Sequence, residues 1–166
     1  MNKSVQDIGN ALSAALETNM ERVRGAGNLL SSTTPVTENM VEDMFNGLAA
    51  CIMGSHALAV HSGWWTNKDG TPIDAKDPHL FGTKIALIHS EISEAMEGGR
   101  KGLDDSHLPH RKALEVELAD ALIRIFDLAG AMNLELADAV IEKLAYNQQR
   151  ADHKPENRFA EGGKVF

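Results

Sequence analysis

The sequence lacks three features that would indicate particular environments. Cys51 is its only cysteine, so no intrachain disulfide can form, and a buried thiol is the expected state. Basic residues are few: 16 Lys and Arg stand against 24 Asp and Glu, a net charge of −8, which argues against a broad surface for nucleic acid or anionic membranes. No run reaches the roughly 18 apolar residues that span a membrane. The opening MNKSVQDIGNALSAALE lacks the long apolar core of a signal peptide, so we expect a cytoplasmic protein.

Apolar residues at helical spacing fill most of the chain and predict an all-α protein. A first helix is expected over residues 4–24, ended by Gly25 and Gly27, with a linker over residues 31–37. A second is expected from its cap at Thr37 to about Ser62, and a last one over residues 134–149. Residues 66–81 are polar and predict a long loop. The 166 residues suit a single domain overall, with residues 1–30 as an accessory helix and 37–166 as the main part.

Two more helical patterns lie between residues 84 and 130, separated by a polar turn rich in Gly, Pro and Asp, and predict an antiparallel hairpin. Each carries two carboxylates three residues apart, on the same rotational side of its apolar stripe, at about 80° and 140° from the centre. The pairs are Glu91 with Glu94 and Glu117 with Asp120. The stripes are Ile85, Ile88, Ile92, Ala95 and Met96 in the first helix, and Leu114, Leu118, Ala121, Leu122 and Ile125 in the second.

Antiparallel packing brings same-side helix edges together, so the four carboxylates are expected to converge. Converging carboxylates repel one another and need a counter-charge, which a hard divalent cation such as Mg²⁺ supplies. The alternative is that these acids only solvate helix faces. Glu135 and Asp138 have the same spacing but begin the last helix, where the helix dipole alone accounts for them. Arg124, four residues after Asp120, is expected to form a structural ion pair with it.

These motifs resemble those of the MazG-like family of all-α NTP pyrophosphatases, over about residues 38–166. The family signature is E-x-x-E on one helix and E-x-x-D on the next, which this chain matches with Glu91-Ile-Ser-Glu94 and Glu117-Leu-Ala-Asp120. Upstream, the resemblance includes Gly63-Trp64-Trp65. Downstream, Lys143, Tyr146, Asn147 and Arg150 match K-x-x-Y-N-x-x-R. One departure is Ser90, which stands where some members carry an extra Glu thought to activate water.

The resemblance implies an antiparallel four-helix-bundle-like MazG fold with an additional N-terminal helix. It also implies an enzyme that hydrolyses a (d)NTP to a (d)NMP and pyrophosphate, possible substrates including dGTP or another dNTP as in phage members. Two or more Mg²⁺ ions, replaceable by Mn²⁺, would be held by Glu91, Glu94, Glu117 and Asp120. The implied assembly is a dimer or tetramer.

Five further residues are candidates for binding the nucleotide. Basic side chains hold phosphate oxygens, and an amide adds a directional contact. Of the two tryptophans, one is expected to seal the core and the other to stack on the base, and Lys84 to approach a phosphate or pair with the acidic cluster. The candidates are Lys143, Asn147, Arg150, Trp65 and Lys84.

Two other classes of protein are compatible with a helical chain of this kind. One is a catalytically silent interaction protein that keeps the scaffold. The other is a di-metal carboxylate bundle, which normally uses Glu-x-x-His. No Glu in this sequence has a His three residues later, which weighs against that class.

Overall fold

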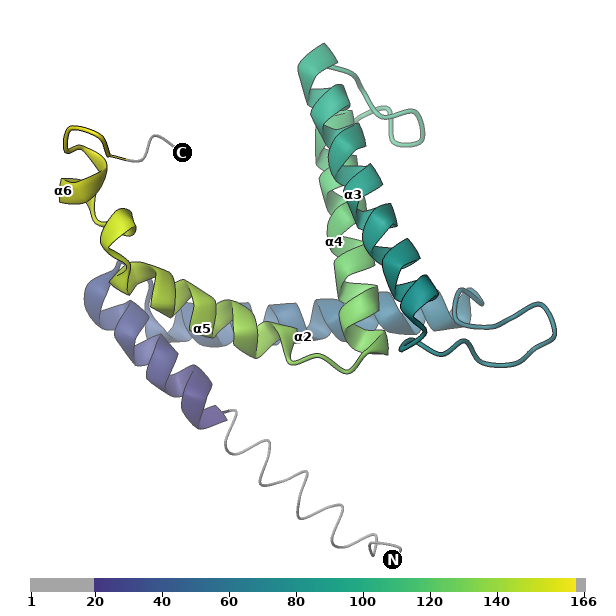
Figure 1. The fold of residues 1–166 in the computed structure, drawn as a ribbon, viewed down its shortest axis with the longest axis horizontal. Helices are drawn as coiled ribbons and strands as arrows, with labels where there is room; N and C mark the ends of the chain where they lie inside the picture. The colour runs from purple at the N-terminus through teal and green to yellow at the C-terminus, as the bar shows by residue number, and fades with distance from the viewer. Residues whose placement is uncertain (1–19, 164–166) are drawn as a thin grey trace, which may run out of the picture. The chain divides into compact units, whose positions relative to one another are not determined.

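The computed structural model describes residues 20–163 and confirms the all-α class (Figure 1). Only isolated bridges, Thr66 with Pro72 and Asp104 with Lys112, interrupt the helical architecture of these residues. The expected first helix falls mainly on residues 1–19, outside the described range. The helices are residues 20–33, α2 (Glu38–His61), α3 (Pro78–Lys101), α4 (Ala113–Ala131), α5 (Leu136–Gln149), the 3-10 turn η1 (Ala151–His153) and α6 (Pro155–Arg158).

The chain divides into two compact units, which are described separately. One comprises residues up to 48 together with those from 135 onward, and the other comprises residues 49–134. Within the range that the structure describes, no helix is long and apolar enough to cross a membrane.

The first unit is held together by a small apolar core in which residues 20–33 pack with α2 and α5. The sequence predicted that Gly25 and Gly27 end the first helix, but helical structure continues to residue 33. A Cβ at Gly27 would lie 3.2 Å from Val41 Cγ1, so this glycine allows the close approach of α2. Burial against α2 therefore outweighs the helix propensity that glycine lacks, about 1 kcal/mol per residue. The buried core residues are Val23, Leu30, Val41, Ile141 and Ala145.

Two helix starts follow from local capping chemistry. The Thr37 hydroxyl accepts a hydrogen bond from the Met40 amide at 3.2 Å, confirming the predicted cap of α2. In the second unit α3 starts at Pro78, so the predicted loop is too long at its end. Asp77 caps this helix by accepting from the amides of His79 and Leu80, and proline at the first position has the φ angle that a helix needs.

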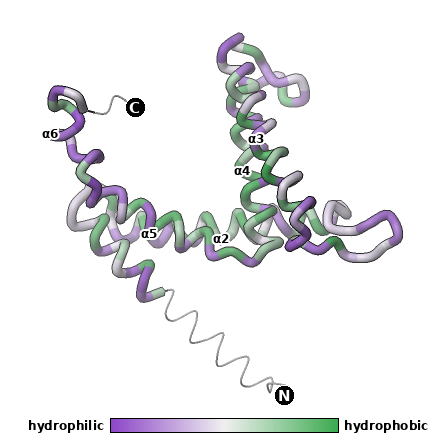
Figure 2. Tube along the Cα trace, in the orientation of Figure 1, coloured by the Kyte–Doolittle hydropathy of each residue, from purple (hydrophilic) through white to green (hydrophobic). Residues whose placement is uncertain are grey.

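The second unit is organised by α3 and α4, which pack antiparallel as predicted. Gly98 lies at their closest approach, where an added Cβ would come within 2.9 Å of Ala113 Cβ. Gly102 ends α3 in the left-handed conformation, with φ 66°. Hydrophobic and hydrophilic residues are interspersed along both helices (Figure 2). Ala95 and Ala121 are buried, whereas the larger members of the predicted stripes, such as Met96 and Leu122, are exposed.

The C-terminal part of α2 also contacts α4 within this unit. His56 on α2 reaches Asp127 on α4, and a Cβ at Gly130 would lie only 2.6 Å from His56 Cβ. Gly130 therefore permits a helix approach that any side chain would obstruct.

Candidate metal centre

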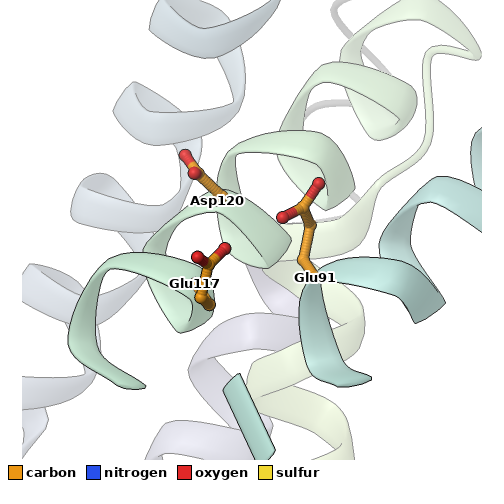
Figure 3. Close-up of side chains that lie close together, drawn as sticks. All are labelled: Glu91, Glu117 and Asp120. Carbon is orange, nitrogen blue, oxygen red and sulfur yellow. The ribbon is translucent and has the colours of Figure 1, made fainter. Parts of the chain in front are cut away.

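The hairpin brings three of the four predicted carboxylates together. Glu91 on α3 and Glu117 and Asp120 on α4 each offer an oxygen within 4.8 Å of the others (Figure 3). The i, i+3 spacing places Glu117 and Asp120 on successive turns of one face. Glu94, one turn after Glu91, is exposed and lies outside this group of three. It is still near enough for its charge to act on Glu117.

Burial and the neighbouring carboxylates make Glu117 costly to ionise. Its pKa is raised, first by burial, then by a hydrogen bond with Glu91 and by the negative charges of Glu94, Glu91 and Asp120. Glu91 itself is buried. A site that makes a carboxylate costly to ionise is one in which a cation would relieve the strain of like charges.

The donor set fits a hard divalent cation. All three ligands are carboxylate oxygens, the type that Mg²⁺ prefers. Opposite ligands of an octahedral Mg²⁺ are about 4.2 Å apart, since each Mg–O distance is about 2.1 Å. Oxygens within 4.8 Å of one another thus need only slight side-chain movement to share one ion. Three carboxylates leave coordination positions open for water or substrate oxygens.

Arg124 is the cationic neighbour of this group, and its partner differs from the predicted one. The guanidinium crosses from α4 to α3, where Nε and Nη2 both lie 2.7 Å from Oε1 of Glu91. The predicted pair with Asp120 is not the contact observed. Sequence spacing favours a partner on the same helix, but the buried Glu91 carboxylate across the hairpin gives a stronger, charge-assisted contact.

A second polar cluster in this unit surrounds Asp127, which is buried. Its Oδ1 accepts from Trp65 Nε1 at 2.7 Å and lies 3.0 Å from His56 Nδ1, while its Oδ2 accepts from Lys84 Nζ at 3.1 Å. Lys84 also lies over the Trp65 ring, 4.2 Å from its centroid. Lys84 is thus paired with Asp127 rather than with the acidic group. Trp65, the tryptophan predicted to bind the nucleotide, is only 7% exposed, whereas Trp64 is 71% exposed, so Trp64 and not Trp65 presents an open ring.

The remaining predicted binding residues lie in the first unit, on α5 and at its C-terminal end. Lys143 Nζ lies 4.5 Å from the centroid of the Tyr146 ring. Arg150 forms a two-bonded ion pair with Asp152, at 2.9 and 2.7 Å. Asn147 Oδ1 is buried and has no hydrogen-bond partner in the described part of the chain.

Sequence reasoning missed the roles of Asp127 and Arg124. Asp127 had a recognisable signal, because it follows Phe126 and precedes Leu128 in an otherwise apolar end of a helix. An acid in such a run is expected to be buried and paired. Arg124 had no such signal, since choosing between Asp120 and Glu91 requires the hairpin geometry.

No protein-family model, curated protein or solved structure matches this chain. The fold and site together define a helical protein with a cluster of three carboxylates that could hold a metal ion.

Proposed function

We propose that this protein is a Mg²⁺-dependent nucleoside triphosphate pyrophosphohydrolase that forms a nucleoside monophosphate and pyrophosphate. The observation that carries the proposal is the convergence of Glu91, Glu117 and Asp120 from the two helices that hold the E-x-x-E and E-x-x-D motifs. The resemblance to the MazG-like family supplies the reaction. A hairpin that brings together acids from both motifs supports it.

In this proposal the three carboxylates bind and orient the metal, and Glu94, one turn from Glu91, completes the set. Bound Mg²⁺ polarises phosphoryl oxygens and lowers the pKa of coordinated water. Ser90 cannot replace the extra Glu of some family members as a base, because a neutral hydroxyl is far less basic than a carboxylate; its hydroxyl donates to the Leu87 carbonyl at 2.8 Å. One of the clustered carboxylates therefore accepts the proton of the attacking water. The proposal includes the phosphate-binding roles that the resemblance implies for Lys143, Asn147 and Arg150.

The test compares two isosteric changes on α4. Glu117→Gln removes one charge from the acidic group and preserves the side-chain shape. Glu115→Gln is the matched control, because Glu115 is exposed and pairs with Arg111 at 3.4 Å. Each protein is incubated with Mg²⁺ and a panel of NTPs and dNTPs, and monophosphate and pyrophosphate are resolved by chromatography.

Wild-type protein and Glu115→Gln are expected to release pyrophosphate at similar rates. Glu117→Gln should be slower by about a hundredfold or more, since metal positioning is lost. Its thermal stabilisation by Mg²⁺ should also shrink, because only binding to the native state stabilises it. No turnover by the wild type on any nucleotide would favour the silent interaction protein instead.

A further inference from the structure

Arg124 occupies one of the two oxygens that Glu91 could offer to the proposed metal. Two of its nitrogens, Nε and Nη2, converge on the same atom, Glu91 Oε1, each at 2.7 Å. A carboxylate oxygen has two lone pairs for hydrogen bonding, so both are engaged by the guanidinium. A cation that binds this oxygen must therefore displace at least one of the two contacts. A cation on the other oxygen of Glu91 would lie beside the positively charged guanidinium of Arg124, which would repel it.

The two partners differ in their freedom to leave. The Glu91 side chain is 8% exposed, whereas the Arg124 side chain is 42% exposed. Arginine is long and flexible, and its charged end can be hydrated while its stem stays packed. Glu91 has no comparable path to water. When a divalent cation competes for Glu91, the guanidinium is the group that can move into solvent.

We propose that Arg124 is an exchangeable counter-ion of Glu91. Its guanidinium holds the Glu91 carboxylate in place when no metal is bound, and a divalent cation displaces it from that carboxylate. This inference rests on the proposed metal binding at Glu91, Glu117 and Asp120. It makes Arg124 a positioning residue that keeps the metal-free site ordered and also weakens cation binding by competition.

The first test observes the guanidinium directly. In ¹⁵N–¹H spectra, the Nε–H signal of Arg124 is assigned by its loss in Arg124→Lys. Without metal it should show a hydrogen-bonded shift and slow exchange with water. Mg²⁺ is added until the backbone amide signals of Glu117 and Asp120 stop changing, which shows that the site is saturated. At that point the Nε–H signal of Arg124 should have moved, and its exchange with water should be faster. An unchanged Nε–H signal in the saturated protein would overturn the inference but leave metal binding intact. Unchanged backbone amides would overturn metal binding itself.

The second test measures competition by calorimetric titration with Mg²⁺. Arg124→Gln removes the competing charge, and Arg100→Gln is the matched control, since Arg100 pairs with Glu97 on α3 in an exposed ion pair. Arg124→Gln should bind Mg²⁺ about tenfold more tightly than the wild type, a factor typical of a charge-assisted contact. The control should stay within about twofold. Equal or weaker binding by Arg124→Gln would contradict the exchange. Arg124→Lys keeps the positive charge but can form fewer hydrogen bonds, so its Mg²⁺ affinity should lie between those of the wild type and Arg124→Gln. This variant also provides the comparison if Arg124→Gln does not fold.

Discussion

The raised pKa of Glu117 links the acidic group to the stability of the metal-free protein. In the folded state Glu117 holds its proton to higher pH than the ordinary Glu value of 4.5. The unfolded chain releases its proton near that value, so between the two pKa values the folded state binds more protons. The contribution of Glu117 to the free energy of unfolding is therefore fully present below about pH 4.5, and it is lost as the pH rises through the pKa of Glu117 in the folded state.

We predict that, in a chelator, the wild type loses stability relative to Glu117→Gln as pH rises above the ordinary Glu value. Comparison with the variant removes the effects of groups such as Asp105, whose pKa is lowered by backbone hydrogen bonds and which acts in the opposite direction. Melting temperatures of both proteins between about pH 4 and 8 give the difference. A wild type that gains on the variant over this range would contradict the prediction.

Asp127 is expected to be the most sensitive charged residue outside the acidic group. It accepts hydrogen bonds from Trp65 and Lys84, and the side chains of Asp127 and Lys84 are 10% and 18% exposed. Asp127→Ala leaves the ammonium of Lys84 without its partner in a largely dry place. We predict a loss of about 3–5 kcal/mol in the free energy of unfolding, measured by urea denaturation.

The matched control for Asp127 is Asp104→Ala. Asp104 pairs with Lys112 at 2.5 Å, but both side chains are more than half exposed. Such surface pairs contribute about 1 kcal/mol or less. Equal losses in the two variants would mean that the Asp127 cluster is not a buried network.

At the scale of helices, local chemistry predicted most of what the structure shows. Thr37 marks the start of α2, and the phases of the two hairpin helices placed Glu91, Glu117 and Asp120 on edges that do meet. These predictions succeed because a cap and a helical phase depend only on neighbouring residues.

The errors arise where a distant residue decides the outcome. Gly27 is accommodated in a helix because Val41 packs against it, and nothing near Gly27 in the sequence indicates this. Arg124 binds Glu91 instead of Asp120 for the same reason: the competing partner is 33 residues away. The predicted loop over residues 66–81 was too long for a local reason. Asp77-Pro78 was assigned to the loop, but an Asp-Pro pair can equally begin a helix, as it does in α3.

Helix contact in the second unit depends on Gly130. An added Cβ would lie 2.6 Å from His56 Cβ and 2.9 Å from its Cγ, atoms near the α2 backbone that cannot easily move. Helix propensity alone favours alanine over glycine by about 1 kcal/mol. We predict that Gly130→Ala nevertheless lowers the free energy of unfolding by about 1–3 kcal/mol, because the overlap forces α2 and α4 apart.

Gly54→Ala is the control, since a Cβ there meets nothing within 4 Å. This change in α2 should stabilise the protein by up to about 1 kcal/mol. Opposite signs in the two variants, measured in one urea series, are the expected result. If Gly130→Ala also stabilises, the close contact of α2 with α4 is wrong.

At the scale of the whole molecule, the exposed apolar side chains need an explanation. The hairpin stripes were expected to face a core, yet Met96 is 70% exposed and Leu122 51% exposed. Met53 on α2, in the same unit, is 72% exposed. Scattered exposed apolar residues are ordinary, but several on neighbouring helices are what a subunit interface would leave exposed on a single chain. Closed symmetric assembly of identical subunits is the commonest way to cover such a surface.

We therefore predict a homo-oligomer, a dimer or tetramer, in which the exposed side chains of the hairpin are buried against a second copy. Light scattering at micromolar concentration should give a multiple of the 18.0 kDa chain mass. Met96→Glu and Leu122→Glu should shift the mass toward that of one chain, because each would bury an unpaired charge in the interface. Leu108→Glu is the control: Leu108 is 43% exposed but lies in the connection between α3 and α4, outside the helical stripes. A monomeric wild type, or dissociation by Leu108→Glu alone, would place these side chains outside any subunit interface.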